Sequence, residues 1–274
     1  MTAISMPVPG GIPLLGFGTY PLMGEDAIRA ARMAIDLGIR HIDTAQMYGN
    51  EREIGRAVAL SGLPRDDFFL VTKIDPGNLG AGRFADSVAR SVEDLGGPAD
   101  LLLIHWPPAE DDFDAALDRL MAERAKGNAR AIGVSNFSPA MMRRAQLRCG
   151  GAIVNNQVEF HPLLDQREVL ATARELGITL SAYSPLARGA ALKPPAIITI
   201  AAKLKRQPSE VVLRWIMQQG VVAIPMTTKR DNAVSNITAL GFELSPEDMA
   251  AISALGTRQG RTINPGWMAG RWEP

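Results

Sequence analysis

Eight short and almost uninterrupted hydrophobic runs recur along the chain, and the segments between them place apolar residues at helical spacing. Strands without polar alternation are covered on both faces, as in a parallel sheet. Eight alternating units therefore predict an α/β fold, a (β/α)8 TIM barrel. The predicted strands are 14–19, 41–43, 69–73, 101–105, 131–135, 153–159, 179–184 and 221–227. The predicted helices are 26–36, 51–60, 84–95, 113–124, 139–148, 167–175, 210–219 and 231–238.

Two flanking regions add to this pattern. The proline- and glycine-rich residues 6–13 predict an N-terminal hairpin, and Ser245-Pro246-Glu247 begins a further helix that ends near Leu255. The tail 256–274 contains two tryptophans, which favours a tail that folds over the mouth of the barrel rather than one that trails in solvent. No linker or repeat divides the chain, so we expect a single domain over residues 1–274.

Composition restricts the class of protein. The 274 residues carry 29 basic and 29 acidic side chains, so no net charge attracts a polyanion and we expect no nucleic acid partner. The single cysteine forms no internal disulfide, and residues 1–5 lack the pattern of a signal peptide. No apolar run approaches the roughly 18 residues of a membrane span. We therefore expect a cytoplasmic protein without membrane contact, and a monomer.

Several common binding motifs are missing. The run 16–18 begins like a dinucleotide fingerprint, but Pro21 stands where its third glycine belongs, and no nucleotide phosphate loop occurs. Residues 133–137 lack the second glycine of a nucleophile elbow. The three histidines, which lie far apart and have no cysteine partners, are His41, His105 and His161. We therefore expect no metal site and no serine hydrolase.

Four polar residues, Asp43, Tyr48, Lys73 and His105, end or follow three adjacent predicted strands. Barrel enzymes carry their chemistry at these carboxyl ends. Each residue alone also has an ordinary structural role: Asp43 can cap a turn and Tyr48 can pack on one. Lys73 can extend to solvent, and His105 can be a hydrogen-bonded core histidine. The four together are harder to explain in that way.

The set is chemically coherent. A buried Lys73 needs a counter-charge, which Asp43 on the adjacent strand can supply. An ammonium beside a phenol lowers the pKa of Tyr48 from its usual value of about 10, which predicts a general acid. His105 can then donate to the same carbonyl oxygen while alkoxide charge develops there. This arrangement suits reduction of a carbonyl by a nicotinamide.

At these residues the sequence resembles the aldo-keto reductase superfamily. The stretches that match are 42–51, 71–73, 103–107 and 132–137, and the resemblance extends from Gly16 to about Trp267. It implies an NADPH-dependent barrel in which Asp43, Tyr48, Lys73 and His105 form the catalytic tetrad. Tyr48 is then the proton donor, and the hydride comes from the nicotinamide.

The resemblance also implies cofactor contacts. It places the carboxamide against Ser135, Asn136 and Gln157, the nicotinamide ring against Tyr183, and the pyrophosphate along Ser184, Pro185 and Leu186. The remaining cofactor residues that it implies are Pro225, Thr227, Thr228, Lys229, Asn232 and Asn236. Met226 stands where many family members have lysine. We still expect NADPH rather than NADH, because Lys229 and a predicted helix N-terminus near Arg230 remain.

Within the family, residues 225–230 and the short tail resemble the bacterial 2,5-diketo-D-gluconate reductase B type, which is linked with methylglyoxal. The expected substrates are therefore small aldehydes and ketones, either 2-oxo aldehydes such as methylglyoxal or diketo sugar acids such as 2,5-diketo-D-gluconate. The residues expected to wall the substrate pocket are Tyr20, Met47, Trp106, Phe160 and Trp267.

Two other functions compete with reduction. A barrel aldolase would form a Schiff base through Lys73, but the carboxylate of Asp43 keeps that amine protonated. An NADPH-binding redox sensor would use the same barrel without turnover, and an intact tetrad argues against it.

Overall fold

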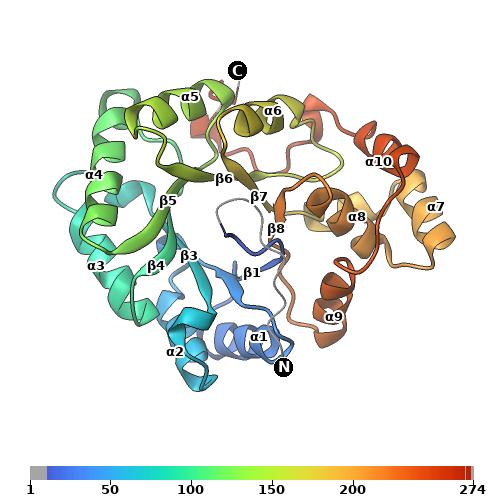
Figure 1. Cartoon of the computed structure of the whole chain (residues 1–274), viewed down its shortest axis with the longest axis horizontal. Coiled ribbons are helices and arrows are strands. Elements are labelled where there is room, and N and C mark those ends of the chain that lie inside the picture. The colour runs from blue at the N-terminus through green and yellow to red at the C-terminus, as the bar shows by residue number, and fades with distance from the viewer. Residues whose placement is uncertain (1–10, 269, 273–274) are drawn as a thin grey trace.

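The computed structural model describes residues 11–268 and 270–272, and in it eight parallel strands form one sheet in chain order. The strands are β1 (Gly16–Gly18), β2 (His41–Asp43), β3 (Phe69–Ile74), β4 (Ala99–Ile104), β5 (Ala129–Ser135), β6 (Ile153–Glu159), β7 (Thr179–Tyr183) and β8 (Val222–Ala223). Figure 1 looks along the resulting barrel, with helices around the strands. The predicted (β/α)8 fold is confirmed.

The barrel closes between β8 and β1. A parallel bridge joins Leu15 to Ala223, whose amide donates to the Leu14 carbonyl at 2.9 Å, and the Gly18 amide donates to the Pro225 carbonyl at 3.1 Å. β8 is shorter than the predicted 221–227, since only two residues pair before Pro225, which has no amide hydrogen to donate. The seam is therefore the shortest pairing in the sheet.

Ten helices accompany the strands in the described part of the chain. They are α1 (Gly24–Asp36), α2 (Glu51–Leu60), α3 (Phe84–Leu95), α4 (Phe113–Ala125), α5 (Pro139–Arg148), α6 (Arg167–Glu175), α7 (Pro195–Leu204), α8 (Pro208–Met217), α9 (Arg230–Thr238) and α10 (Pro246–Ser253). α5 and α10 start in the same way: Ser138 and Ser245 cap them, and a proline follows each cap. None of the helices found in residues 11–268 and 270–272 is long and apolar enough to cross a membrane.

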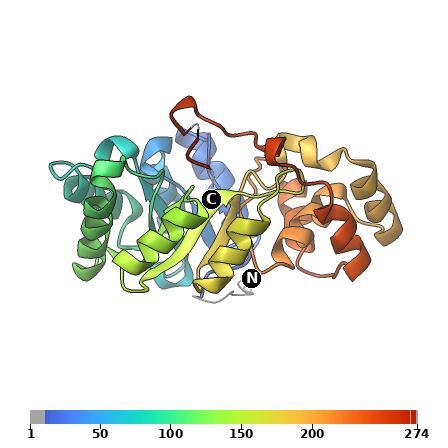
Figure 2. The same cartoon turned by 90° about the horizontal axis from the view of Figure 1, so that it is seen from above.

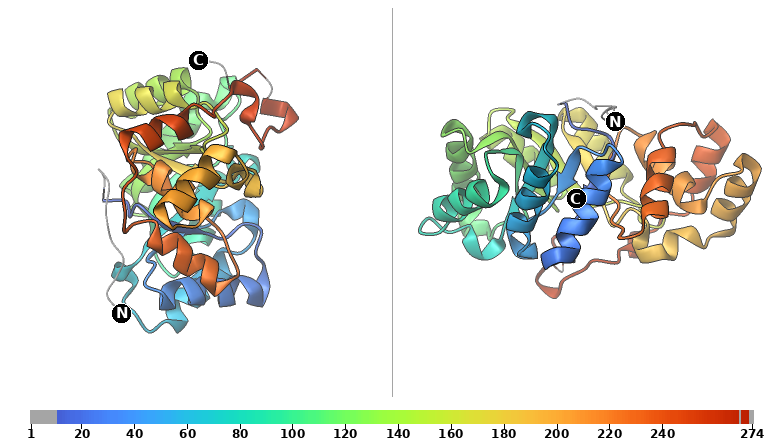
Figure 3. Two further views of the ribbon diagram at one scale, coloured as in Figure 1. Left: turned by 90° about the vertical axis from the view of Figure 1, so that its right-hand side faces the viewer. Right: turned by 90° about the horizontal axis from the view of Figure 1, so that it is seen from below.

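The sequence pattern did not predict α7. This helix lies outside α8 and beside α10, on the side that faces the viewer in the left panel of Figure 3. Its apolar run includes Ile198, which is exposed, so the polar face that marks a helical period is absent. The predicted hairpin at 6–13 falls mostly on residues outside the described ones.

Alternation along β3 decides which side chains enter the barrel. Val71 and Lys73 share the inner face, and Val71 packs there in a group with Leu101, Leu103 and Val222. Leu70 and Ile74 point to the helices instead. Lys73 therefore sits above the apolar filling of the barrel, at the carboxyl end of the strands.

The C-terminal tail lies across that same end of the barrel (Figure 2). Its Thr257 bridges to Leu164, and Arg271 donates to the carbonyls of Pro107 and Pro108 at 3.3 and 2.7 Å. The right panel of Figure 3 shows the tail at the same end from the opposite side. The expectation that the tail folds over the mouth is thus correct for its described residues.

Candidate active site

Lys73 is the centre of a buried polar cluster at the mouth of the barrel. Its Nζ donates to Asp43 Oδ1 at 2.6 Å, to the Thr44 carbonyl at 2.9 Å and to Tyr48 Oη at 3.2 Å. The other carboxylate oxygen of Asp43 accepts from Gln157 Nε2 at 2.7 Å. The structure therefore brings three of the four predicted catalytic residues into direct hydrogen-bond contact.

The charge state of Lys73 follows from these contacts. Burial alone would lower the pKa of Lys73, but the charge of Asp43 and the hydrogen bonds to Asp43 and Tyr48 outweigh burial and raise it above its usual value. An ammonium at neutral pH is not a nucleophile, so this geometry argues against a Schiff base at Lys73.

Tyr48 differs from its sequence-based expectation. Burial raises the pKa of Tyr48, and although Lys73 lowers it in part, the net shift is upward rather than downward. The expected net lowering was wrong, because the sequence shows the cation but not the desolvation of the phenol. Tyr48 is consequently a protonated donor at neutral pH, and Lys73 can stabilise the phenolate once the proton has left.

His105 completes the cluster from the other side of Tyr48. The two rings meet edge to face with centroids 5.6 Å apart. Burial, with a smaller contribution from the charge of Lys73, lowers the pKa of His105 well below its usual value, so the imidazole is neutral. Its Nδ1 is buried and has no hydrogen-bond partner among the described residues. The other ring nitrogen, Nε2, has no hydrogen-bond partner among the described residues either and retains accessible surface, so it is the nitrogen that a bound ligand can reach.

A second network joins the ends of β5, β6 and β7. Asn136 Nδ2 donates to the His105 carbonyl and to Ser135 Oγ, both at 3.1 Å, and its Oδ1 accepts from Tyr183 Oη at 2.8 Å. Ser135 Oγ in turn donates to the Gln157 carbonyl at 2.8 Å. Burial raises the pKa of Tyr183, so its hydroxyl remains protonated and keeps this bond. The four residues expected around the nicotinamide are thus held in one rigid group.

A cavity of about 710 Å³ opens over both networks. Among its lining residues are these predicted ones: Tyr20, Asp43, Met47, Tyr48, His105, Trp106, Asn136, Gln157, Tyr183, Ser184, Pro185, Leu186 and Pro225. Ser184 has a left-handed backbone with φ of 47°, which turns the chain sharply after β7 along the cavity wall. One open cavity therefore joins most of the predicted catalytic, cofactor and substrate residues.

Phe160 requires a correction. Its ring is 3% exposed and stacks against Trp215 of α8 with centroids 5.5 Å apart. It belongs to the core between strands and helices and does not line the cavity. The chain position directly after β6 was a poor guide, because Phe160 points to the helices rather than to the mouth.

Other predicted residues lie away from the cavity wall. Trp267 is exposed and packs edge to face on Trp106, with centroids 5.0 Å apart. Ser135 and Asn236 are buried without lining the cavity, and Thr227 is buried with its Oγ1 accepting from the Lys229 amide at 3.1 Å. The exposed residues outside the wall, on and before α9, are Thr228, Lys229 and Asn232. Their expected cofactor roles stay predictions.

Several residues of the site were missed at the sequence level, and three of them decide its shape or charge. Arg188 and Ile263 line the cavity, and Glu159 holds the segment that carries Ile263. Glu159 is fully buried and accepts from the Thr262 amide at 2.8 Å, the Ile263 amide at 3.1 Å and His161 Nε2 at 3.0 Å. The one available signal was an acidic residue at the end of an apolar strand, where Glu159 stands.

Comparisons with known proteins agree with this geometry. The model of the Aldo/keto reductase family matches residues 14–257, and the chain belongs to that family. It is 39% identical over 266 residues to the methylglyoxal reductase DkgB of Escherichia coli O157:H7, covering 96% of this chain and 99% of the relative. An aldo-keto reductase of Mycolicibacterium smegmatis is 40% identical over 256 residues, covering 93% and 92%.

Two solved structures are similar throughout. One, described as a proposed 2,5-diketo-D-gluconic acid reductase B, superimposes with a TM-score of 0.94 at 38% identity and covers 100% of this chain and 98% of its own. A Bombyx mori aldo-keto reductase in complex with NADP gives a TM-score of 0.90 at 26% identity, with 99% of both chains covered. The protein is therefore an NADP-dependent oxidoreductase.

The residues present fit NADP(H). Asn136 and Gln157 line the cavity together with half-buried Tyr183, and His105 lies in the same wall. Along the loop after β7, Ser184 and Arg188 have left-handed backbones, and both line the cavity. Polar amides, an aromatic face and a loop with a cation are what a nicotinamide and its phosphates require.

Proposed function

We propose that this enzyme reduces small 2-oxo aldehydes, with methylglyoxal as the preferred type of substrate, and diketo sugar acids less well. The observation that carries the proposal is the placement of Tyr48, bonded to Lys73, in the wall of an open cavity. Asn136, Gln157, Tyr183 and the loop after β7 would hold NADPH, which would supply the hydride. The names of two relatives, a methylglyoxal reductase and a diketogluconic acid reductase, support the substrate class.

The chain's own residues supply the proton and the stabilisation of charge. As the carbonyl carbon gains hydride, its oxygen becomes an alkoxide, and Tyr48 gives its hydroxyl proton to that oxygen to complete the alcohol. Lys73 stabilises the resulting phenolate through its hydrogen bond, and Asp43 keeps Lys73 charged. The neutral His105 supplies a second hydrogen bond to the same oxygen.

The lining of the cavity favours an uncharged substrate. Near Tyr48 the wall consists of Tyr20, Met47, Trp106 and Ile263, none of which carries a charge. Arg188, on the loop after β7, is the single arginine or lysine in the described lining, and we assign it to the cofactor side. A sugar acid would leave its carboxylate without a cation near the reacting carbonyl, which costs binding energy.

The test combines binding with turnover. Titration with NADPH and NADH by fluorescence, followed by NADPH oxidation with methylglyoxal and with 2,5-diketo-D-gluconate, measures cofactor and substrate preference together. We expect tighter binding of NADPH and a higher kcat/KM for methylglyoxal. A higher kcat/KM for the sugar acid would refute the preference, and NADPH binding without turnover of either would favour a redox sensor. The single domain, the monomer and the absence of a nucleic acid partner stay predictions.

A further inference from the structure

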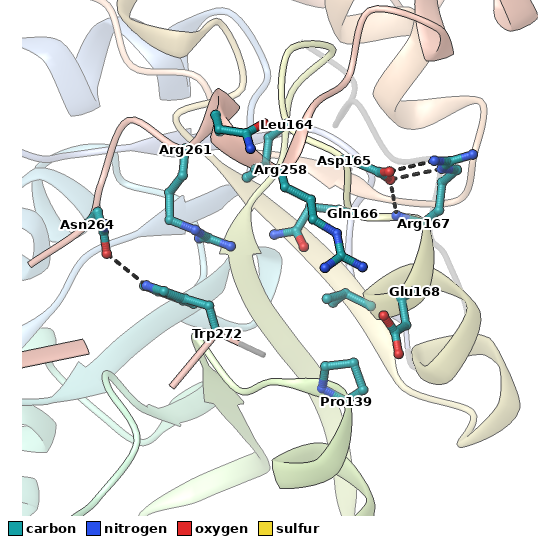
Figure 4. A pocket seen from close by; sticks show the side chains of 12 residues that line it. Pro139, Leu164, Asp165, Gln166, Arg167, Glu168, Arg258, Arg261, Asn264 and Trp272 are labelled. Carbon is teal, nitrogen blue, oxygen red and sulfur yellow. Dashed lines mark hydrogen bonds and ion pairs between the residues drawn. The ribbon is translucent and has the colours of Figure 1, made fainter. Parts of the chain in front are cut away.

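A second cavity, of about 550 Å³, lies between the tail and the starts of α5 and α6 (Figure 4). It shares no lining residue with the cavity of the active site. The residues that line it are Pro139, Leu164, Asp165, Gln166, Arg167, Glu168, Val169, Arg258, Gln259, Arg261, Asn264 and Trp272. Nothing in the reduction of a carbonyl uses this space.

Two arginines supply the cavity with unused hydrogen-bond donors. Arg258 forms no hydrogen bond or ion pair with any described residue, and Figure 4 shows its guanidinium extending into the space above Pro139. Arg261 stacks on the ring of Trp272 at 3.7 Å, and its Nη1 is buried without a hydrogen-bond partner among the described residues. By contrast, Arg167 is satisfied by both carboxylate oxygens of Asp165.

The partial pairing of Arg261 is unusual for a buried cation. Its side chain is 14% exposed, and the nearest acidic atom, Glu159 Oε2, lies 3.8 Å away, beyond hydrogen-bond distance. That carboxylate already accepts hydrogen bonds from His161, Thr262 and Ile263. Nη1 therefore faces Glu159, and the donors that Arg261 leaves for an external oxyanion are Nε and Nη2, which form no hydrogen bond with any described residue.

The surrounding backbone adds positive potential. Pro139 is the first residue of α5 and Arg167 the first of α6, so both helices direct their positive ends toward the cavity. Two carboxylates of the lining oppose this potential: Asp165, which is paired with Arg167 and also interacts with the charge of Arg258, and Glu168, which forms no ion pair within the described chain. An anion bound here would be attracted by Arg258 and Arg261 and repelled by Glu168.

We propose that this cavity binds a small organic anion, a carboxylate or a phosphate monoester, through the guanidinium groups of Arg258 and Arg261. Its volume lies within the range of small-molecule sites and exceeds what an inorganic ion needs. The site borders the active site without overlapping it, since Ile263 lines one cavity and its neighbour Asn264 lines the other.

Calorimetric titration with citrate and with inorganic phosphate tests the site. The protein is first saturated with NADP⁺, so that the cofactor's own phosphate positions are filled and do not bind the probe. We expect Arg258→Gln to weaken binding about tenfold or more, because a charge-assisted hydrogen-bond partner is lost. Glu168→Gln removes a repulsion and tightens binding. Arg124→Gln on α4 is the matched control, since it removes the same charge from an exposed position outside the cavity.

The outcomes separate clearly. Tighter citrate binding identifies a carboxylate ligand and tighter phosphate binding a phosphate ester, and either supports the site if Arg258→Gln weakens it. No heat of binding for both probes, or equal affinities in Arg258→Gln and Arg124→Gln, overturns the proposal. The readout needs no carbonyl turnover, so its failure is distinguishable from a failure of the proposed function.

Discussion

The mouth of the barrel has two sides that are built in different ways. On one side Asp43, Lys73 and His105 stand at the ends of neighbouring strands, and their contacts come from within the barrel. On the other side the cavity wall includes Ile263, which belongs to a tail segment bonded to Glu159, a residue 103 and 104 positions earlier in the chain than Thr262 and Ile263. The catalytic residues are thus positioned by the strands of the barrel, whereas the position of Ile263 in the cavity wall depends on contacts between the tail and residues distant in sequence.

Removal of the proton donor has the largest expected effect. Tyr48→Phe should lower kcat by about 10²- to 10⁴-fold, because general acid catalysis is lost while the ring remains. Binding of NADPH, measured by fluorescence titration, should stay unchanged. Tyr20→Phe is the comparison variant: it removes the hydroxyl of a wall residue that packs on Tyr48 with centroids 5.1 Å apart, so it should change kcat little, although KM can change. Substantial turnover by Tyr48→Phe would remove Tyr48 from the mechanism.

The buried ion pair can be broken from one side or replaced from both. Lys73→Met leaves Asp43 buried without its cation and should cost about 3–5 kcal/mol in the free energy of unfolding. The double variant Asp43→Asn/Lys73→Met should return to within about 1 kcal/mol of the wild type and remain inactive. Urea denaturation measures both. Equal losses in the single and double variants would show that pairing is not the cause.

Loss of the contact between Glu159 and the tail should affect KM more than kcat. Glu159→Gln removes a charged acceptor and should cost about 1–3 kcal/mol in stability. We expect faster hydrogen exchange at the amides of Thr262 and Ile263 and a rise in KM, while kcat changes little. A large fall in kcat with an unchanged KM would contradict the separation of the two sides.

The contact between Glu159 and the tail should make KM depend on pH. Burial alone would raise the pKa of Glu159, but hydrogen bonds from His161, Thr262 and Ile263 outweigh it and lower the pKa below its usual value. Because the pKa of Glu159 is lower in the folded protein, its ionised carboxylate stabilises the docked tail fully at pH values above the unfolded pKa of about 4.3. That stabilisation is lost as the pH falls through the folded pKa. KM should therefore rise in acid in the wild type and stay flatter in Glu159→Gln.

The smallest expected effects come from substitutions of Phe160, a core residue, and Trp106, a residue of the cavity wall. Phe160→Leu should cost about 1–2 kcal/mol in stability with KM unchanged, because its ring packs on Trp215 rather than on the cavity. Trp106→Leu should raise KM instead, since Trp106 lines the cavity. Steady-state kinetics with methylglyoxal distinguish them, and a raised KM in Phe160→Leu would restore it to the wall.

The two sides also differ in how far the sequence predicts them. Asp43, Lys73 and His105 could be identified because the end of an apolar strand marks the mouth of a parallel barrel. Phe160 was misplaced, since one position beyond a strand decides between mouth and core. Ile263 and Arg261 gave no local signal, because their positions depend on a contact with Glu159 that is distant in sequence.

The net pKa shift of a catalytic residue such as Tyr48 is equally hard to predict from the sequence. The sequence predicted that Lys73 lies near Tyr48, and in the structure the charge of Lys73 lowers the pKa of the phenol as expected. The burial that reverses the net shift is a property of the whole packed mouth, and no motif records it.

The short seam between β1 and β8 has a consequence for the lifetime of the protein. Gly18 on one side of the seam and Ile224, Pro225 and Met226 on the other all line the cavity proposed for the nucleotide. A bound nucleotide would contact both strands of this shortest pairing. At a free concentration of 100 times its dissociation constant, it would raise the free energy of unfolding by about 2.7 kcal/mol. The supply of NADPH in a cell would then govern how long each molecule escapes proteolysis, as well as how fast it works.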